Sequence, residues 1–119
     1  LCTAQVLFSN KEYEAAHDRL TFYSFENINY SILADVLLIK IYYVTDNDLI
    51  YNRIRALEQK TRRSKLTQWN KESYLNFLKF LTRVLKYEHD KNSKKWEKVR
   101  TDFQTIRPIL EREWLLSIL

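Results

Sequence analysis

The 119-residue sequence contains no glycine and one proline. Average glycine usage of about 7% would give roughly eight glycines in a chain of this length. Tight β-hairpins and phosphate-binding loops need glycine at positive φ, so the composition disfavours a β-rich fold, a P-loop and a dinucleotide-binding fingerprint. We therefore predict an all-α protein.

Size and hydropathy indicate one folded helical domain over residues 1–119. Hydrophobic residues make up 45% of the chain and charged residues 29%, which is typical of neither a disordered nor a membrane protein. The most apolar run, residues 32–44, contains Asp35 and Lys40 and is too short to span a bilayer. With one cysteine and no visible signal peptide, a cytoplasmic location is the default expectation.

Apolar residues recur with a helical period along most of the chain. The predicted helices cover residues 1–8, 11–20, 32–44 and 48–63, a long helix from Thr67 or Asn70 to a polar loop at 88–93, a sixth helix through Trp96 and Ile106, and a seventh from Pro108 to Ile118. Residues 21–30 are expected to connect the second helix to the third.

Polar residues at the predicted helix starts supply the caps. Ser9 and Asn10 are expected to cap the second helix, Asn29 or Ser31 the third, and residues 46–47 the fourth. We expect one contiguous core made of Leu37, Leu38, Ile41, Tyr42, Leu57, Phe77, Leu78, Leu81 and Leu85.

Residues 7–16, LFSNKEYEAA, resemble the turn and second-helix start of a tetratricopeptide repeat, with Tyr13 and Ala16 at the aromatic and alanine positions. About 35 residues later, close to the repeat length of about 34, residues 42–48 resemble the same junction. There Asp48 stands for the aromatic residue and Tyr51 for the alanine. The second match is thus degenerate.

The resemblance implies antiparallel helix pairs stacked as a short α-solenoid, with two degenerate repeats over residues 1–65, the first one truncated, and C-terminal capping helices over residues 66–119. Residues 74–81 and 113–116 look similar to the C-terminal part of large uncharacterised bacterial proteins with such repeats. A stack of this kind usually serves as a docking surface for other proteins, and the resemblance implies no activity.

The N-terminal edge is expected to expose apolar surface. In a repeat array each helix pair covers the next, so residues 1–8 would be the tail of a helix whose neighbour lies upstream. Val6, Leu7 and Phe8 would then favour self-association through this edge.

Residues with catalytic or metal-binding chemistry form no complete set. Glu14 and His17 share a helix face at i, i+3 spacing, as in di-iron bundles, but His89 has Lys86 in the corresponding place and further glutamates are missing. Cys2 is expected on the buried side of the first helix as a small hydrophobe. We therefore expect no enzyme activity, no metal and no organic cofactor.

Charge is distributed unevenly along the chain. Residues 1–48 have three basic and seven acidic side chains, a net charge of −4, and residues 49–100 have 15 basic and five acidic side chains, a net charge of +10. A possible basic interaction surface consists of Arg53, Arg55, Lys60, Arg62, Arg63, Lys65 and Trp69. Solvated lysines explain such a region most simply, ahead of an acidic partner and then a nucleic acid.

The leading hypothesis is a non-catalytic protein-interaction or structural scaffold module that is part of a larger protein. Its partner would be another protein or the remainder of the same chain. The alternative is a nucleic-acid-associated basic helical domain that uses the same basic residues.

Overall fold

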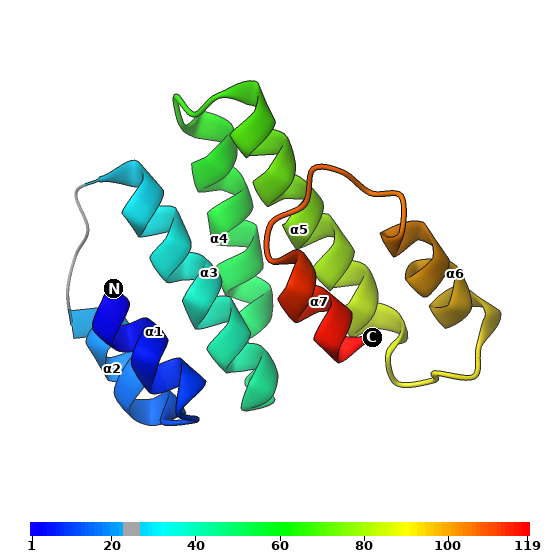
Figure 1. Cartoon of the computed structure of the whole chain (residues 1–119), viewed down its shortest axis with the longest axis horizontal. Coiled ribbons are helices and arrows are strands. Elements are labelled where there is room, and N and C mark those ends of the chain that lie inside the picture. Colours follow the sequence, from blue (N-terminus) through cyan, green and yellow to red (C-terminus); the bar gives the residue numbers. More distant parts are fainter. Residues whose placement is uncertain (23–26) are drawn as a thin grey trace. The chain divides into compact units, whose positions relative to one another are not determined.

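The computed structural model describes residues 1–22 and 27–119, and within them it confirms the all-α prediction. The described residues form seven helices and no strand. The helices are α1 (Cys2–Ser9), α2 (Tyr13–Phe22), α3 (Ile28–Val44), α4 (Leu49–Arg63), α5 (Gln68–Tyr87), α6 (Lys94–Phe103) and α7 (Arg112–Ile118) (Figure 1). They fall into two compact units, Leu1–Lys60 and Thr61–Leu119.

The turn after α1 and the turn after α3 have the same backbone hydrogen bonds. In each, three successive amides donate to the carbonyls four, three and five residues back. The amides belong to Asn10, Lys11 and Glu12 in the first turn and to Thr45, Asp46 and Asn47 in the second. The middle residues, Lys11 and Asp46, have φ of 63° and 54°. Both turns are therefore Schellman motifs, in which a left-handed residue normally supplied by glycine ends the helix.

Capping explains where the first helices differ from expectation. Asn10 ends α1 rather than beginning α2, so the predicted N-cap at Ser9 and Asn10 is wrong. The cap expected at Asn29 or Ser31 is also wrong, because the Asn27 side chain accepts from the amides of Asn29 and Tyr30 and starts α3 at Ile28. The predicted connection over 21–30 includes residues 23–26, which lie outside the described residues.

The helix α3 is the centre of the first unit, because its buried side chains lie on all sides of it. They are Ile32, Ala34, Asp35, Val36, Leu37, Leu38, Ile39, Ile41 and Tyr42. A helix that is apolar all round needs neighbours on several faces. The helix α4 runs antiparallel to it (Figure 1), since Ser31 at the start of α3 meets Lys60 near the end of α4.

The caps of α4 and α5 match the sequence prediction. The Asn47 side chain accepts from the amide of Leu49 at 2.9 Å, and the Thr67 side chain accepts from the amide of Asn70. Ile50, Ile54 and Leu57, which recur with a helical period along α4, are buried. These ends are predictable because a side-chain oxygen satisfies amides that the helix leaves without a partner.

In the second unit, α6 and the segment after it return along α5. The rings of Phe80 on α5 and Phe103 on α6 lie 5.0 Å apart. Further along, the Asn76 side chain donates to the Pro108 carbonyl at 2.8 Å, and Phe77 contacts Trp114 of α7 with ring centroids 6.4 Å apart. The helix α7 thus covers α5 (Figure 1).

The prediction that Pro108 begins the last helix is wrong. The bond between Arg107 and Pro108 is cis, α6 ends at Phe103, and α7 begins only at Arg112. The Arg112 guanidinium donates to the carbonyls of Ile106 at 3.2 Å and Phe103 at 3.1 Å. Burial, and then the charge of Arg107, lower the pKa of Arg112. A cation thus binds the carbonyls at and beyond the end of α6, which its dipole favours.

The expected core residues are buried with one exception. Leu85 is half-buried, and the other eight are buried, the first five in Leu1–Lys60 and the rest in Thr61–Leu119. Their union into one contiguous core stays a prediction. Among the described residues, no helix has the length and apolar character needed to cross a membrane.

Replacing Lys11 by glycine should stabilise the protein. A residue other than glycine pays about 1 to 2 kcal/mol for left-handed geometry, so we expect Lys11→Gly to raise the free energy of unfolding by about 1 kcal/mol in urea titrations. Lys11→Ala keeps the conformational cost and should give no gain. An equal effect of both variants would mean that the lysine side chain, and not its φ, sets the cost.

Candidate binding surfaces

The buried carboxylate of Asp35 organises two of the predicted basic residues. Asp35 is 8% exposed and accepts from Lys60 Nζ at 2.6 Å and from Arg53 Nη1 at 3.3 Å. Lys60 Nζ also donates to Ser31 Oγ at 2.7 Å. A buried carboxylate needs such partners, because desolvation without them is costly. Arg53 and Lys60 therefore join α4 to α3.

The other predicted basic residues lie on the surface. In the first unit, Arg55 donates to the side chain of Asn52 at 3.0 Å. In the second unit, Arg62, Arg63 and Lys65 are exposed, and Trp69 is 65% exposed at the start of α5. That the seven residues form one binding surface stays a prediction.

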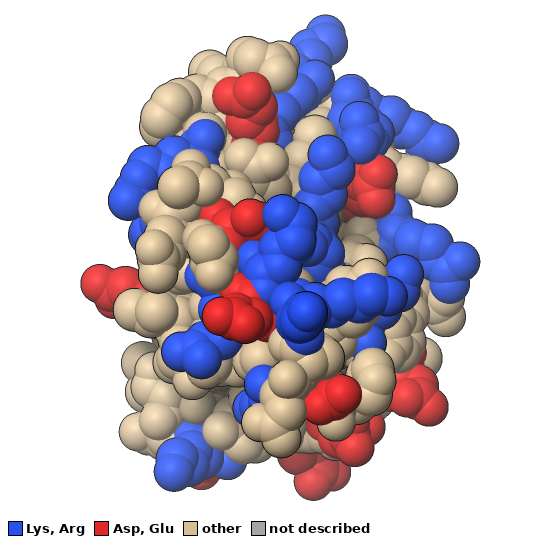
Figure 2. Space-filling model, turned by 90° about the vertical axis from the view of Figure 1, so that its right-hand side faces the viewer, with Lys and Arg blue, Asp and Glu red and all other residues tan. Residues whose placement is uncertain are grey.

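Lysines of α5 and α6 line a second basic feature, which we call the lysine groove. It is a hollow of about 400 Å³ lined by Thr82, Arg83, Lys86, Tyr87, Lys95 and Lys98. Figure 2 looks onto the side where α6 lies and shows many Lys and Arg side chains there, with Asp and Glu among them. None of the six lining residues is acidic.

Sequence reasoning missed the lysine groove. Its signal was present, since Arg83 and Lys86 on one helix and Lys95 and Lys98 on the next share helix faces at i, i+3 spacing. The contact between the two helices that brings these pairs together is not readable from spacing alone.

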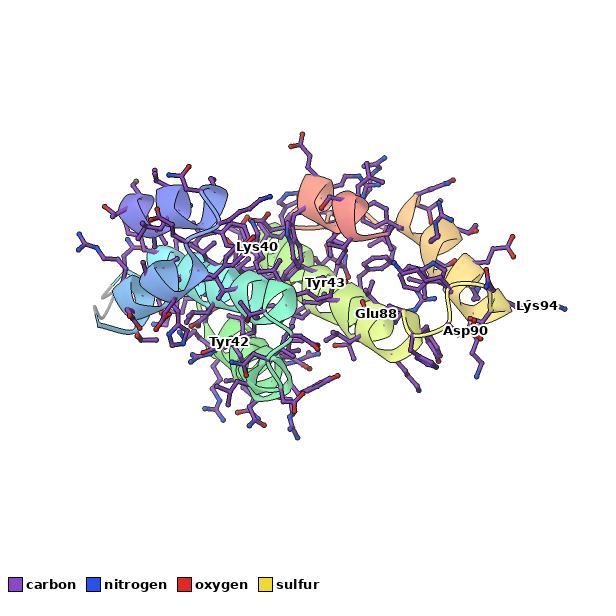
Figure 3. The ribbon with its side chains drawn as sticks, turned by 90° about the horizontal axis from the view of Figure 1, so that it is seen from below. Lys40, Tyr42, Tyr43, Glu88, Asp90 and Lys94 are labelled. Carbon is purple, nitrogen blue, oxygen red and sulfur yellow. The ribbon has the colours of Figure 1, made fainter. Side chains whose placement is uncertain are left out.

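A smaller groove lies between α2 and the end of α3, and we call it the α2–α3 groove. It has a volume of about 250 Å³ and is lined by Tyr13, Glu14, His17, Ile41, Tyr42, Thr45 and Asn47. His17 Nε2 and the Tyr42 hydroxyl are 3.0 Å apart. Tyr42 lies in the last turn of α3 (Figure 3) and is 4% exposed, so its ring forms the floor.

Glu14 and His17, the pair with i, i+3 spacing, both line the α2–α3 groove. Among the residues that the structure describes, no three His, Cys, Asp or Glu side chains are placed to hold a metal ion. Asp18 lies 3.7 Å from His17 Nδ1. The imidazole thus lies between the Tyr42 hydroxyl and the exposed Asp18 carboxylate.

Four further sequence-predicted positions are located by the structure. The prediction that Cys2 is buried is wrong: Cys2 is exposed, and Ala4 is the buried residue of α1. Val6 is 59% exposed, but Phe8 contacts the ring of Tyr13. Self-association through this edge stays a prediction. His89 is exposed, in the turn whose Asp90 is labelled in Figure 3.

Comparisons with known proteins give no match. No family model matches the sequence, and neither the curated proteins nor the solved structures contain a match to it.

Removing the Asp35 carboxylate should destabilise the protein. Asp35→Asn takes away two charge-assisted hydrogen bonds from a buried position, and we expect a loss of about 1 to 3 kcal/mol in the free energy of unfolding. The matched control is Arg55→Met on the exposed face of α4, which should change it by less than about 0.5 kcal/mol. Equal losses would show that Asp35 does not join α3 to α4.

Proposed function

We propose that this chain is a non-catalytic protein-interaction module whose first 65 residues are two degenerate tetratricopeptide-like helix pairs. Two turns with the same hydrogen bonds, about 35 residues apart, support this. The helices α1 and α2 would form the first pair and α3 and α4 the second, with the later helices closing the stack.

Burial supports the same repeat with a shift of one residue. Ala16 and Leu20 of α2 are 0% and 4% exposed, and Ile50 and Ile54 of α4, about 34 residues later, are 3% and 6% exposed. Tyr51, which sequence spacing aligned with Ala16, is instead 50% exposed. The inward position of the second pair is therefore Ile50, and this departure makes the sequence signature of the second repeat degenerate.

The α2–α3 groove is the observation that carries the proposed function. Its wall and floor offer the rings of Tyr13 and Tyr42 beside Ile41, with the Glu14 carboxylate among the lining residues. A site of this size and composition accommodates one or two side chains of a peptide. Aromatic rings and a carboxylate attract a cation, so the peptide would present lysine or arginine. Residues 1–60 have six basic and eight acidic side chains, a net charge of −2, which would favour a basic peptide at this unit.

Selection from a random peptide library displayed on phage tests this function with the full chain. We expect the enriched peptides to contain a lysine or arginine next to an apolar residue. Their affinity, measured by fluorescence anisotropy, should fall about fivefold in Glu14→Lys, because an exposed ion pair contributes up to about 1 kcal/mol.

The matched control is Glu12→Lys, which changes the net charge equally at an exposed position that does not line the groove. Its affinity should stay close to that of the unchanged chain. Failure to enrich any peptide, or equal losses in Glu12→Lys and Glu14→Lys, would contradict binding in the α2–α3 groove.

The alternative function, nucleic-acid association, is favoured by exposed Trp69 near Arg63 and Lys65 in sequence. Bases stack on exposed aromatic rings beside cations. This alternative predicts a steep negative slope of log affinity against log salt for single-stranded oligonucleotides, with weaker binding in Trp69→Ala. A flat salt response would remove it.

A further inference from the structure

The lysine groove is built by two helices that hold four cations on facing sides. Arg83 and Lys86 come from α5, and Lys95 and Lys98 come from α6. Contact between Phe80 and Phe103 fixes α6 against α5 beneath them, with ring centroids 5.0 Å apart. The cations therefore occupy a surface that the apolar packing holds in place.

One part of this surface already accepts a carboxylate. Asp102 Oδ2 lies 3.0 Å from Arg83 Nη2 and 3.7 Å from Lys98 Nζ. The local geometry is thus suited to a carboxylate that bridges α5 and α6.

The other part of the groove holds a second pair of cations, Lys86 and Lys95, and no acidic side chain lines it. Lys86 Nζ and Lys95 Nζ lie 5.4 Å and 5.6 Å from the centre of the Tyr87 ring. The ring attracts both ammonium groups and so gathers two positive charges from different helices. No lining residue of the groove is acidic, and both lysines are exposed.

We propose that the lysine groove binds an acidic segment of a partner protein, with a carboxylate of the partner placed between Lys86 and Lys95 as Asp102 lies between Arg83 and Lys98. Residues 61–119 contain 14 basic and seven acidic side chains, a net charge of +7, which would steer an acidic partner towards this unit. This surface shares no residue with the α2–α3 groove, so it is a second binding site beyond the proposed function.

Aromatic exposure favours an acidic peptide over a nucleic acid at this site. Single-stranded nucleic acids bind where aromatic rings offer a free face to bases, but Tyr87 is half-buried and carries two ammonium groups. Trp96 is 2% exposed. The exposed Trp69 lies at the opposite end of α5, about 27 Å away along the helix at about 1.5 Å per residue. The groove therefore offers positive charge but no free aromatic face on which a base could stack.

Binding of a fluorescein-labelled oligoglutamate peptide to the full chain tests the proposal, measured by anisotropy at low and physiological salt. The double variant Lys86→Gln/Lys95→Gln should weaken binding about tenfold, because it removes two ion pairs that are partly screened by solvent. An oligoglutamine peptide of the same length should not bind.

The matched control is Lys79→Gln/Lys94→Gln, which removes the same charge from exposed positions on α5 and α6 outside the groove. It should change the affinity less than about twofold. Equal weakening by both double variants would show that the effect depends only on net charge, and this would overturn the proposal. Absence of peptide binding would also overturn it. If an oligothymidylate bound more tightly than the oligoglutamate, and only the groove variant lost this binding, the ligand of the groove would be a nucleic acid and not an acidic peptide.

Discussion

The apolar character of α3 is the constraint on which the first unit depends. Its buried side chains point in all directions, so α3 is stable in water only when other helices cover it. Asp35 within this helix adds a second requirement, because a buried carboxylate needs cations. Lys60 and Arg53 of α4 meet that requirement. The same helix pair thus buries the apolar surface and neutralises the charge that it encloses.

The sequence predicted the local caps that begin α4 and α5 but misplaced the local caps near Asn10 and Asn27, and it failed at the start of α7, where distant residues act. Thr67 and Asn47 cap helices through amides two or three residues away, which is a local signal. Pro108 instead lies in a segment held by Asn76 of α5, and its helix starts later because Arg112 reaches back to the carbonyls of Phe103 and Ile106. Spacing carries no information about such contacts.

Because the sequence does not show contacts between distant residues, the predicted basic surface also differs from the observed basic surfaces. Lys60 and Asp35 are 25 residues apart in sequence, so reading along the chain counts Lys60 as surface charge when it is a partner of a buried acid. Lys86 and Lys95 come together only because α6 returns against α5. Counting charges along the sequence therefore overestimates the exposed positive charge near Arg53 and underestimates the positive charge that gathers near Tyr87.

The absence of glycine affects the backbone conformation at helix ends as well as the fold class. Left-handed residues end α1 and α3, and the chain uses Lys11 and Asp46 there, with Glu111 preceding α7 in the same geometry. Each pays a conformational cost that glycine would avoid. The second turn opens at the edge of the α2–α3 groove, where Thr45 and Asn47 line the hollow, and Asn47 also caps α4. The left-handed residue Asp46 thus sets the turn from which Thr45 and Asn47 line one side of the groove.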